Sequence, residues 1–128
     1  MVNRAVFTTL LCLASMLLSA SAWAQVPASL VGTWSAKWQT DNREYDATLT
    51  VTESGGTWQT LTRNRTNACA GREVPMKLES STASGAEFTL MFSEVLPGCP
   101  NAKVALSVGT DGKVSGIRSR FPLSLVKK

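Results

Sequence analysis

The sequence contains no histidine, and this absence removes several kinds of chemistry together. Histidine is the usual general base at neutral pH and the commonest protein ligand for transition metals. The chain has only three cysteines and nine acidic residues, and none of their spacings is typical of a metal site or a catalytic triad. We therefore expect a protein that is not an enzyme and that carries no metal and no cofactor.

Beyond the N-terminal region the sequence also lacks a long apolar run, so we expect no membrane span after processing. A strong basic patch is missing as well, because the formal net charge is only +4. The late basic residues Arg118, Arg120, Lys127 and Lys128 have no interleaved aromatic residues of the kind that bind nucleic acid. We interpret them as a solvated edge and tail, and we expect no nucleic-acid partner.

The first 24 residues have the organisation of an export signal. Arg4 gives a positive start, residues 5–20 are largely apolar and uncharged, and Ala22-Trp23-Ala24 provides small residues before a cleavage site. We predict a signal peptide over residues 1–24 and a single domain over residues 25–128, of a size that forms one modest core. The mature protein is expected to be periplasmic or secreted.

Two cysteines, Cys69 and Cys99, remain after this processing. An even pair in an exported chain predicts a disulfide. The alternative is a metal site, but two isolated cysteines without histidine form a poor ligand set. A bridge across this spacing would contribute roughly 3 to 4 kcal/mol to stability in the chain-entropy description.

Apolar residues recur with period two along the mature chain, which indicates β-strands. Trp34, Ala36 and Trp38 form one such run, and residues 45–51 form the next, after a turn at residues 41–42. Similar runs recur at short intervals to residue 125, and no helical periodicity competes with them. The sequence predicts an all-β protein, a small up-and-down antiparallel β-barrel of seven or eight strands, with a two-sheet β-sandwich as the alternative.

Gly116 marks a change in this alternation. The apolar residue before it, Val114, is even-numbered, whereas Ile117, Phe121 and Leu123 after it are odd-numbered. A β-bulge inserts one residue and exchanges the two faces of a strand, so we predict a bulge at Gly116.

The stretch LVGTW, residues 30–34, places Gly32-Thr33-Trp34 at the entry to the first strand. Together with the strand meander in an exported chain, it resembles the lipocalin and avidin group of small β-barrels. It is also similar to small periplasmic barrels that inhibit proteases. The first resemblance implies a barrel that binds a small molecule, in which Trp34 closes one end and has a structural role.

The expected third strand, from Thr57 to Arg65, supports a binding pocket. If Trp58 faces inwards, Thr60 and Thr62 share its face, because side chains two residues apart point the same way. Buried hydroxyls need partners, and a ligand could supply them. A small apolar or amphipathic ligand would then contact Trp38, Tyr45, Trp58, Thr60 and Thr62. The alternative is a bulge near Leu61 that turns the threonines to solvent.

Two loops suggest a different function, the binding of a partner protein such as a secreted hydrolase. Val95 and Leu96 stand between turn-forming residues in a loop that also contains Cys99. Arg63 and Arg65 belong to a basic cluster that could receive an acidic partner. In the alternative interpretation Leu96 packs under the barrel rim and the arginines are solvated. An envelope protein without a ligand is the third possibility.

Overall fold

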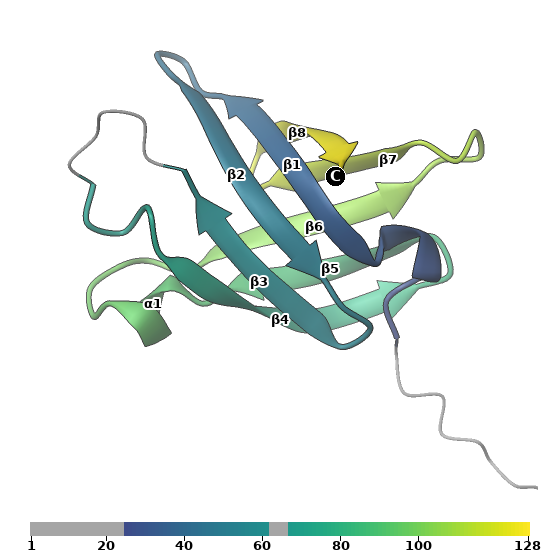
Figure 1. The fold of residues 1–128 in the computed structure, drawn as a ribbon, viewed down its shortest axis with the longest axis horizontal. Coiled ribbons are helices and arrows are strands. Elements are labelled where there is room, and N and C mark those ends of the chain that lie inside the picture. Colours follow the sequence, from purple (N-terminus) through teal and green to yellow (C-terminus); the bar gives the residue numbers. More distant parts are fainter. Residues whose placement is uncertain (1–24, 62–66) are drawn as a thin grey trace, which may run out of the picture.

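The structure, a computed structural model, describes residues 25–61 and 67–128, so the predicted signal peptide lies outside it. Eight antiparallel strands form a closed barrel in which each strand pairs with the next and β8 returns to β1 (Figure 1). The strands are β1 (Gly32–Gln39), β2 (Glu44–Val51), β3 (Gly55–Thr60), β4 (Glu73–Thr82), β5 (Gly85–Leu90), β6 (Ala102–Val108), β7 (Val114–Arg118) and β8 (Phe121–Lys127). The predicted up-and-down barrel is confirmed, and the sandwich alternative is wrong.

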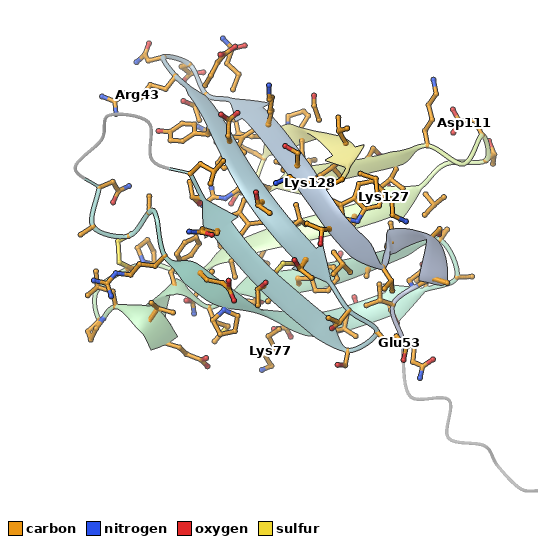
Figure 2. The ribbon with its side chains drawn as sticks, in the orientation of Figure 1. Arg43, Glu53, Lys77, Asp111, Lys127 and Lys128 are labelled. Carbon is orange, nitrogen blue, oxygen red and sulfur yellow. A yellow bond between two sulfur atoms is a disulfide. The ribbon has the colours of Figure 1, made fainter. Side chains whose placement is uncertain are left out.

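Alternation of side chains across the sheet explains the barrel. In β1, Trp34, Ala36 and Trp38 are buried, and their β2 partners Leu49, Ala47 and Tyr45 lie on the same inner face. The charged side chains of Lys77 on β4 and Asp111 in the β6–β7 turn point away from the barrel (Figure 2). Because every strand has two neighbours, the sheet has no unpaired edge. The inner faces of all eight strands enclose a single apolar core.

The middle of the barrel is filled by large apolar side chains. Among the most buried of them are Leu49, Trp58, Val74, Phe88, Leu90 and Val104. They come from five strands and belong to one continuous core. A ligand site inside the barrel must therefore lie towards one of its ends.

One end of the barrel, here called the η1 end, is covered by a single 3₁₀ turn, η1 (Ala28–Leu30). Leu30 is completely buried, and the indole Nε1 of Trp34 donates a hydrogen bond to the Leu30 carbonyl oxygen at 2.9 Å. Trp34 therefore holds the covering turn in place. This contact is sufficient to account for a buried tryptophan at this position.

The opposite end, here called the α1 end, carries a short helix, α1 (Phe92–Val95). We expected no helix beyond the export signal, and this is wrong: Leu96 N donates to Phe92 O at 3.0 Å, which closes one helical turn. A helix of four residues is too short to produce a periodic signal. Within the described ranges, no helix is long and apolar enough to cross a membrane.

The disulfide between Cys69 and Cys99 is confirmed, with an Sγ–Sγ distance of 2.04 Å. It joins the β3–β4 connection to the β5–β6 connection, which contains α1. Cys99 is buried, and Cys69 packs against the core at its edge. The bridge therefore fixes two loops of the α1 end to the barrel.

The bulge predicted at Gly116 is wrong. The β6–β7 pairing runs without a shift from Val108–Val114 to Val104–Arg118, and Ile117 points outwards with 43% of its surface exposed. The exchange of faces occurs instead at the two-residue β7–β8 turn, where Ser119 has φ of 56°. Gly116 is closely packed, because a Cβ there would lie 2.9 Å from Leu106 Cδ2, and that side chain would have to shift. The register shift of this barrel lies in β4, between Leu78 and Ser80.

Candidate functional site

The α1 end is formed by four connections between strands. The β1–β2 and β7–β8 turns are short, whereas the β3–β4 and β5–β6 connections are longer and are joined by the disulfide. In Figure 1 the β1–β2 hairpin and α1 both lie on the left side of the barrel, away from η1. The predicted ligand-contacting side chains that the structure describes lie just inside this end.

Three aromatic side chains form a cluster inside the α1 end. Trp38 and Tyr45 are register partners on β1 and β2, and their rings stack with centroids 5.3 Å apart and planes 8° apart. Trp58 on β3 lies 5.6 Å from Trp38, with its ring tilted by 47°. Trp38 and Trp58 are buried, while Tyr45 is half-buried. We call these three residues the aromatic cluster.

A hydroxyl group lies among the apolar side chains of this end. Thr60 is only 7% exposed, and its Oγ1 accepts a hydrogen bond from Trp58 Nε1 at 2.9 Å. The strand therefore turns Trp58 and Thr60 inwards, while Leu61 just beyond them is 42% exposed. Thr62, the third predicted residue of this face, lies outside the described residues.

Arg118 also points into the barrel, and this corrects our interpretation of it as a solvated edge residue. It pairs with Val104, which is almost fully buried, and cross-strand partners share a face. The Arg118 Cζ atom lies over three rings, at 5.2 Å from the centroid of Trp38, 5.9 Å from Phe92 and 6.0 Å from Trp58. A guanidinium over aromatic faces is attracted by the negative potential of the rings.

Burial affects the pKa of Arg118. It lowers the pKa of the guanidinium below its ordinary value, and the nearby Tyr45 acts in the opposite direction. The group nevertheless stays charged at neutral pH, as arginine does in proteins. Its Nε is buried and has no hydrogen-bond partner within residues 25–61 and 67–128.

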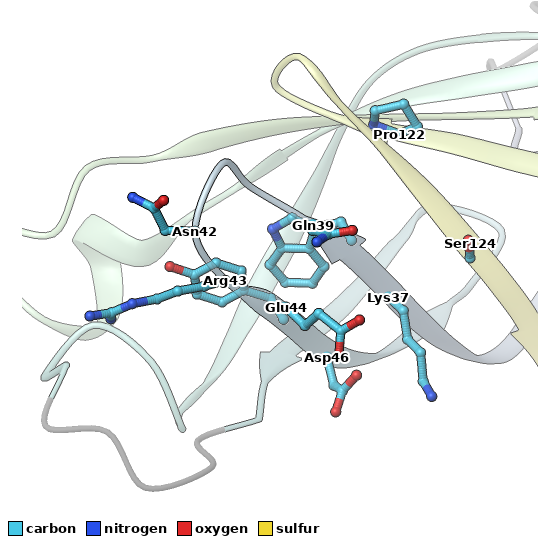
Figure 3. Close-up of a pocket in the computed structure, with 10 residues that line it drawn as sticks. Lys37, Gln39, Asn42, Arg43, Glu44, Asp46, Pro122 and Ser124 are labelled. Atoms are coloured by element: carbon cyan, nitrogen blue, oxygen red, sulfur yellow. The ribbon is translucent and has the colours of Figure 1, made fainter.

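A cavity of about 830 Å³ adjoins the aromatic cluster on the side of β8 (Figure 3). It lies where β1 and β8 separate, because these strands pair only over Trp34–Lys37. Its lining consists of Lys37, Trp38, Gln39, Asn42, Arg43, Glu44, Tyr45, Asp46, Pro122 and Ser124. The cavity thus combines two rings of the aromatic cluster with a polar rim. No group of three or more potential metal ligands exists in the described part of the chain.

Only two of the four residues predicted to contact a partner protein lie in the described part of the chain. Val95 and Leu96 are half-buried and pack against the core. Their apolar character is therefore accounted for by the fold. Arg63 and Arg65 lie outside the described residues.

Trp38, Tyr45, Trp58 and Thr60, which the sequence predicted to share one site, do lie together inside the α1 end. The sequence did not predict that Arg118 lies beside them. A signal was present: the even-numbered positions Val114, Gly116 and Arg118 form one face if the turn is placed at residues 119–120. Placing the change of face at Gly116 concealed it. No protein-family model, curated protein or solved structure matches this chain.

Proposed function

We propose that this protein is an exported, non-enzymatic binding protein that holds a small apolar or amphipathic ligand at the α1 end of its barrel. The observation that carries the proposal is the aromatic cluster next to a cavity of about 830 Å³. Small-molecule sites are typically cavities of about this size with apolar and aromatic walls and few polar groups. Here Trp38 and Tyr45 supply the aromatic wall, and the rest of the lining is mostly polar. Thr60 and Arg118 contact the aromatic cluster but are not part of this lining.

The rest of the barrel supports this location. Its middle is filled by side chains and its η1 end is covered by Leu30, so the α1 end is where a ligand would find aromatic surface. The disulfide fixes two loops there. Loops that are already ordered lose less entropy when a ligand binds, which favours affinity.

Binding can be tested by calorimetry with small ligands of increasing apolar surface, comparing Trp38→Leu with Trp34→Leu. The two tryptophans lie in the same strand and are similarly buried, but at opposite ends of the barrel. We expect Trp38→Leu to weaken binding at least tenfold, because a ring that lines the cavity is removed. Trp34→Leu is expected to keep the affinity of the folded protein.

Two results would contradict the proposal. One is that no ligand binds saturably at millimolar concentrations. The other is that both substitutions weaken binding equally, which would mean that the α1 end has no special role. Urea unfolding of each variant shows that the proteins compared are folded.

The competing hypothesis, inhibition or masking of a partner protein through Val95, Leu96, Arg63 and Arg65, stays a prediction. Val95 and Leu96 pack against the core, which explains why they are apolar without a partner protein. We therefore propose ligand binding as the main function.

A further inference from the structure

The environment of Arg118 is unusual because it combines a buried charge with a hydrogen-bond donor that lacks an acceptor. Nearly all buried polar groups in proteins have partners. Here the guanidinium is surrounded by Trp38, Trp58 and Phe92, whose rings attract its charge but cannot replace oxygen acceptors for its N–H groups. Its Nε remains buried and unpaired.

We propose that Arg118 binds the acid group of the ligand, so that the α1 end selects small amphipathic carboxylates. The inference rests on the proposed binding function. A guanidinium offers a planar fork of N–H donors that matches the two oxygens of a carboxylate. The apolar body of the ligand would lie against the aromatic cluster, whose Trp38 is also the ring nearest to the Arg118 Cζ atom.

A singly charged acid fits this site better than a doubly charged phosphate. Arg118 supplies one positive charge inside the barrel. The cavity rim carries Lys37 and Arg43 but also Glu44 and Asp46, so it adds no net positive charge (Figure 3). A second negative charge on the ligand would therefore meet a rim without net positive charge.

Burial increases the strength of the expected contact. Charges interact more strongly in a protein interior than in water, because the effective dielectric constant is lower there. The lowered pKa of Arg118 has the same origin, since burial destabilises its charged form. An acid group next to the guanidinium would offset that destabilisation.

The test compares acids with neutral molecules of the same shape. Calorimetric titrations at neutral pH would use octanoate against octanamide and naphthoate against naphthamide, with wild type, Arg118→Met and Arg120→Met. Arg120 is the matched control, because it is exposed in the adjoining turn and lies over the ring of Phe121 outside the cluster. Arg118→Lys keeps the charge but removes the fork.

We expect wild type and Arg120→Met to prefer each acid over its amide by roughly ten- to a hundredfold, the range for a charged hydrogen bond. Arg118→Met should lose this preference and keep its affinity for the amides, and Arg118→Lys should retain part of it. Urea unfolding establishes that each variant is folded. If Arg118→Met does not fold, Arg118→Lys takes its place in the comparison with wild type. A smaller ratio of acid to amide affinity in Arg118→Lys would then support the role of Arg118, and an equal ratio would contradict it.

The possible failures are distinguishable. Equal affinity for acids and amides, or a preference that survives in Arg118→Met, would overturn the role of Arg118 and leave the proposed binding function standing. Absence of binding by all four compounds would overturn the binding function itself, and the role of Arg118 with it.

Discussion

Removal of the disulfide is expected to cause a large loss of stability, which can be calculated from the position of the bridge. Cys69 and Cys99 are separated by 30 residues. Closing a loop of this length in the unfolded chain removes entropy equivalent to about 3.5 kcal/mol at 25 °C in the chain-entropy description. Small domains have roughly 5 to 15 kcal/mol of stability in total, so this is a substantial share.

The double substitution Cys69→Ala with Cys99→Ala tests this value without leaving a free thiol. We expect the free energy of unfolding to fall by about 3 to 4 kcal/mol, plus a smaller loss because Cys99 is buried. The melting temperature should fall by roughly 12 to 32 °C, since each kcal/mol corresponds to roughly 4 to 8 °C in a domain of this size. The m-value should also rise, because the unfolded chain becomes more expanded.

The assay is urea unfolding followed by tryptophan fluorescence, because Trp34, Trp38 and Trp58 are buried in the folded state. The control is wild-type protein treated with a reducing agent, which should lose nearly the same stability as the double variant. A loss below about 1 kcal/mol would refute the reasoning, since it would mean that the loop is not constrained in the unfolded state as the entropy argument assumes.

The remaining predictions concern single side chains, each measured by urea unfolding. Gly56→Ala should destabilise the barrel severely, because Gly56 has φ of 148° and an added Cβ would lie 2.0 Å from Thr50 O; a loss below about 1 kcal/mol would contradict this close approach. Thr60→Val should cost about 1 to 3 kcal/mol, because the buried Trp58 N–H loses its acceptor, and an unchanged midpoint would show that the N–H finds another partner. Leu96→Asp should lower stability by about 2 kcal/mol or more if Leu96 belongs to the core, as its packing indicates, whereas undiminished stability with loss of a protein partner would favour the inhibitor hypothesis. Arg118→Met should leave stability equal or higher, because it replaces a buried charge with an apolar side chain; a loss above about 2 kcal/mol would show that the contacts with the rings outweigh desolvation.

The barrel architecture was predictable because its physical signal is repeated along the whole chain. Runs such as Trp34, Ala36 and Trp38 define a buried face in each strand, and short turns leave few ways to connect successive strands. The disulfide was predictable because only two cysteines remain beyond the expected export signal. The barrel prediction depends on many residues, so an error at one of them does not change it. The disulfide prediction depends on the only pairing that two cysteines allow.

The local features of the α1 end were harder to predict because each depends on the position of one residue. A strand shifted by a single residue turns its whole set of side chains to the opposite face. Placing the change of face at Gly116 instead of Ser119 therefore moved Arg118 from the interior to the surface. Helix α1 escaped prediction for a related reason, since its one turn depends on tertiary contacts such as the hydrogen bond from Met91 N to Pro75 O.

Stability alone does not explain an arginine at position 118. An apolar side chain there would complete the inner face formed with Val104 and Leu106, without the cost of desolvating a charge. Residues that disagree with the local pattern of a fold are most often found at functional sites, where a loss of stability is offset by a gain in binding. Arg118 disagrees with its pattern at the end of the barrel where the aromatic cluster and the cavity meet. The same substitution, Arg118→Met, should therefore leave the free protein at least as stable and remove its preference for acids, and neither a misplaced surface residue nor a purely structural one predicts both effects.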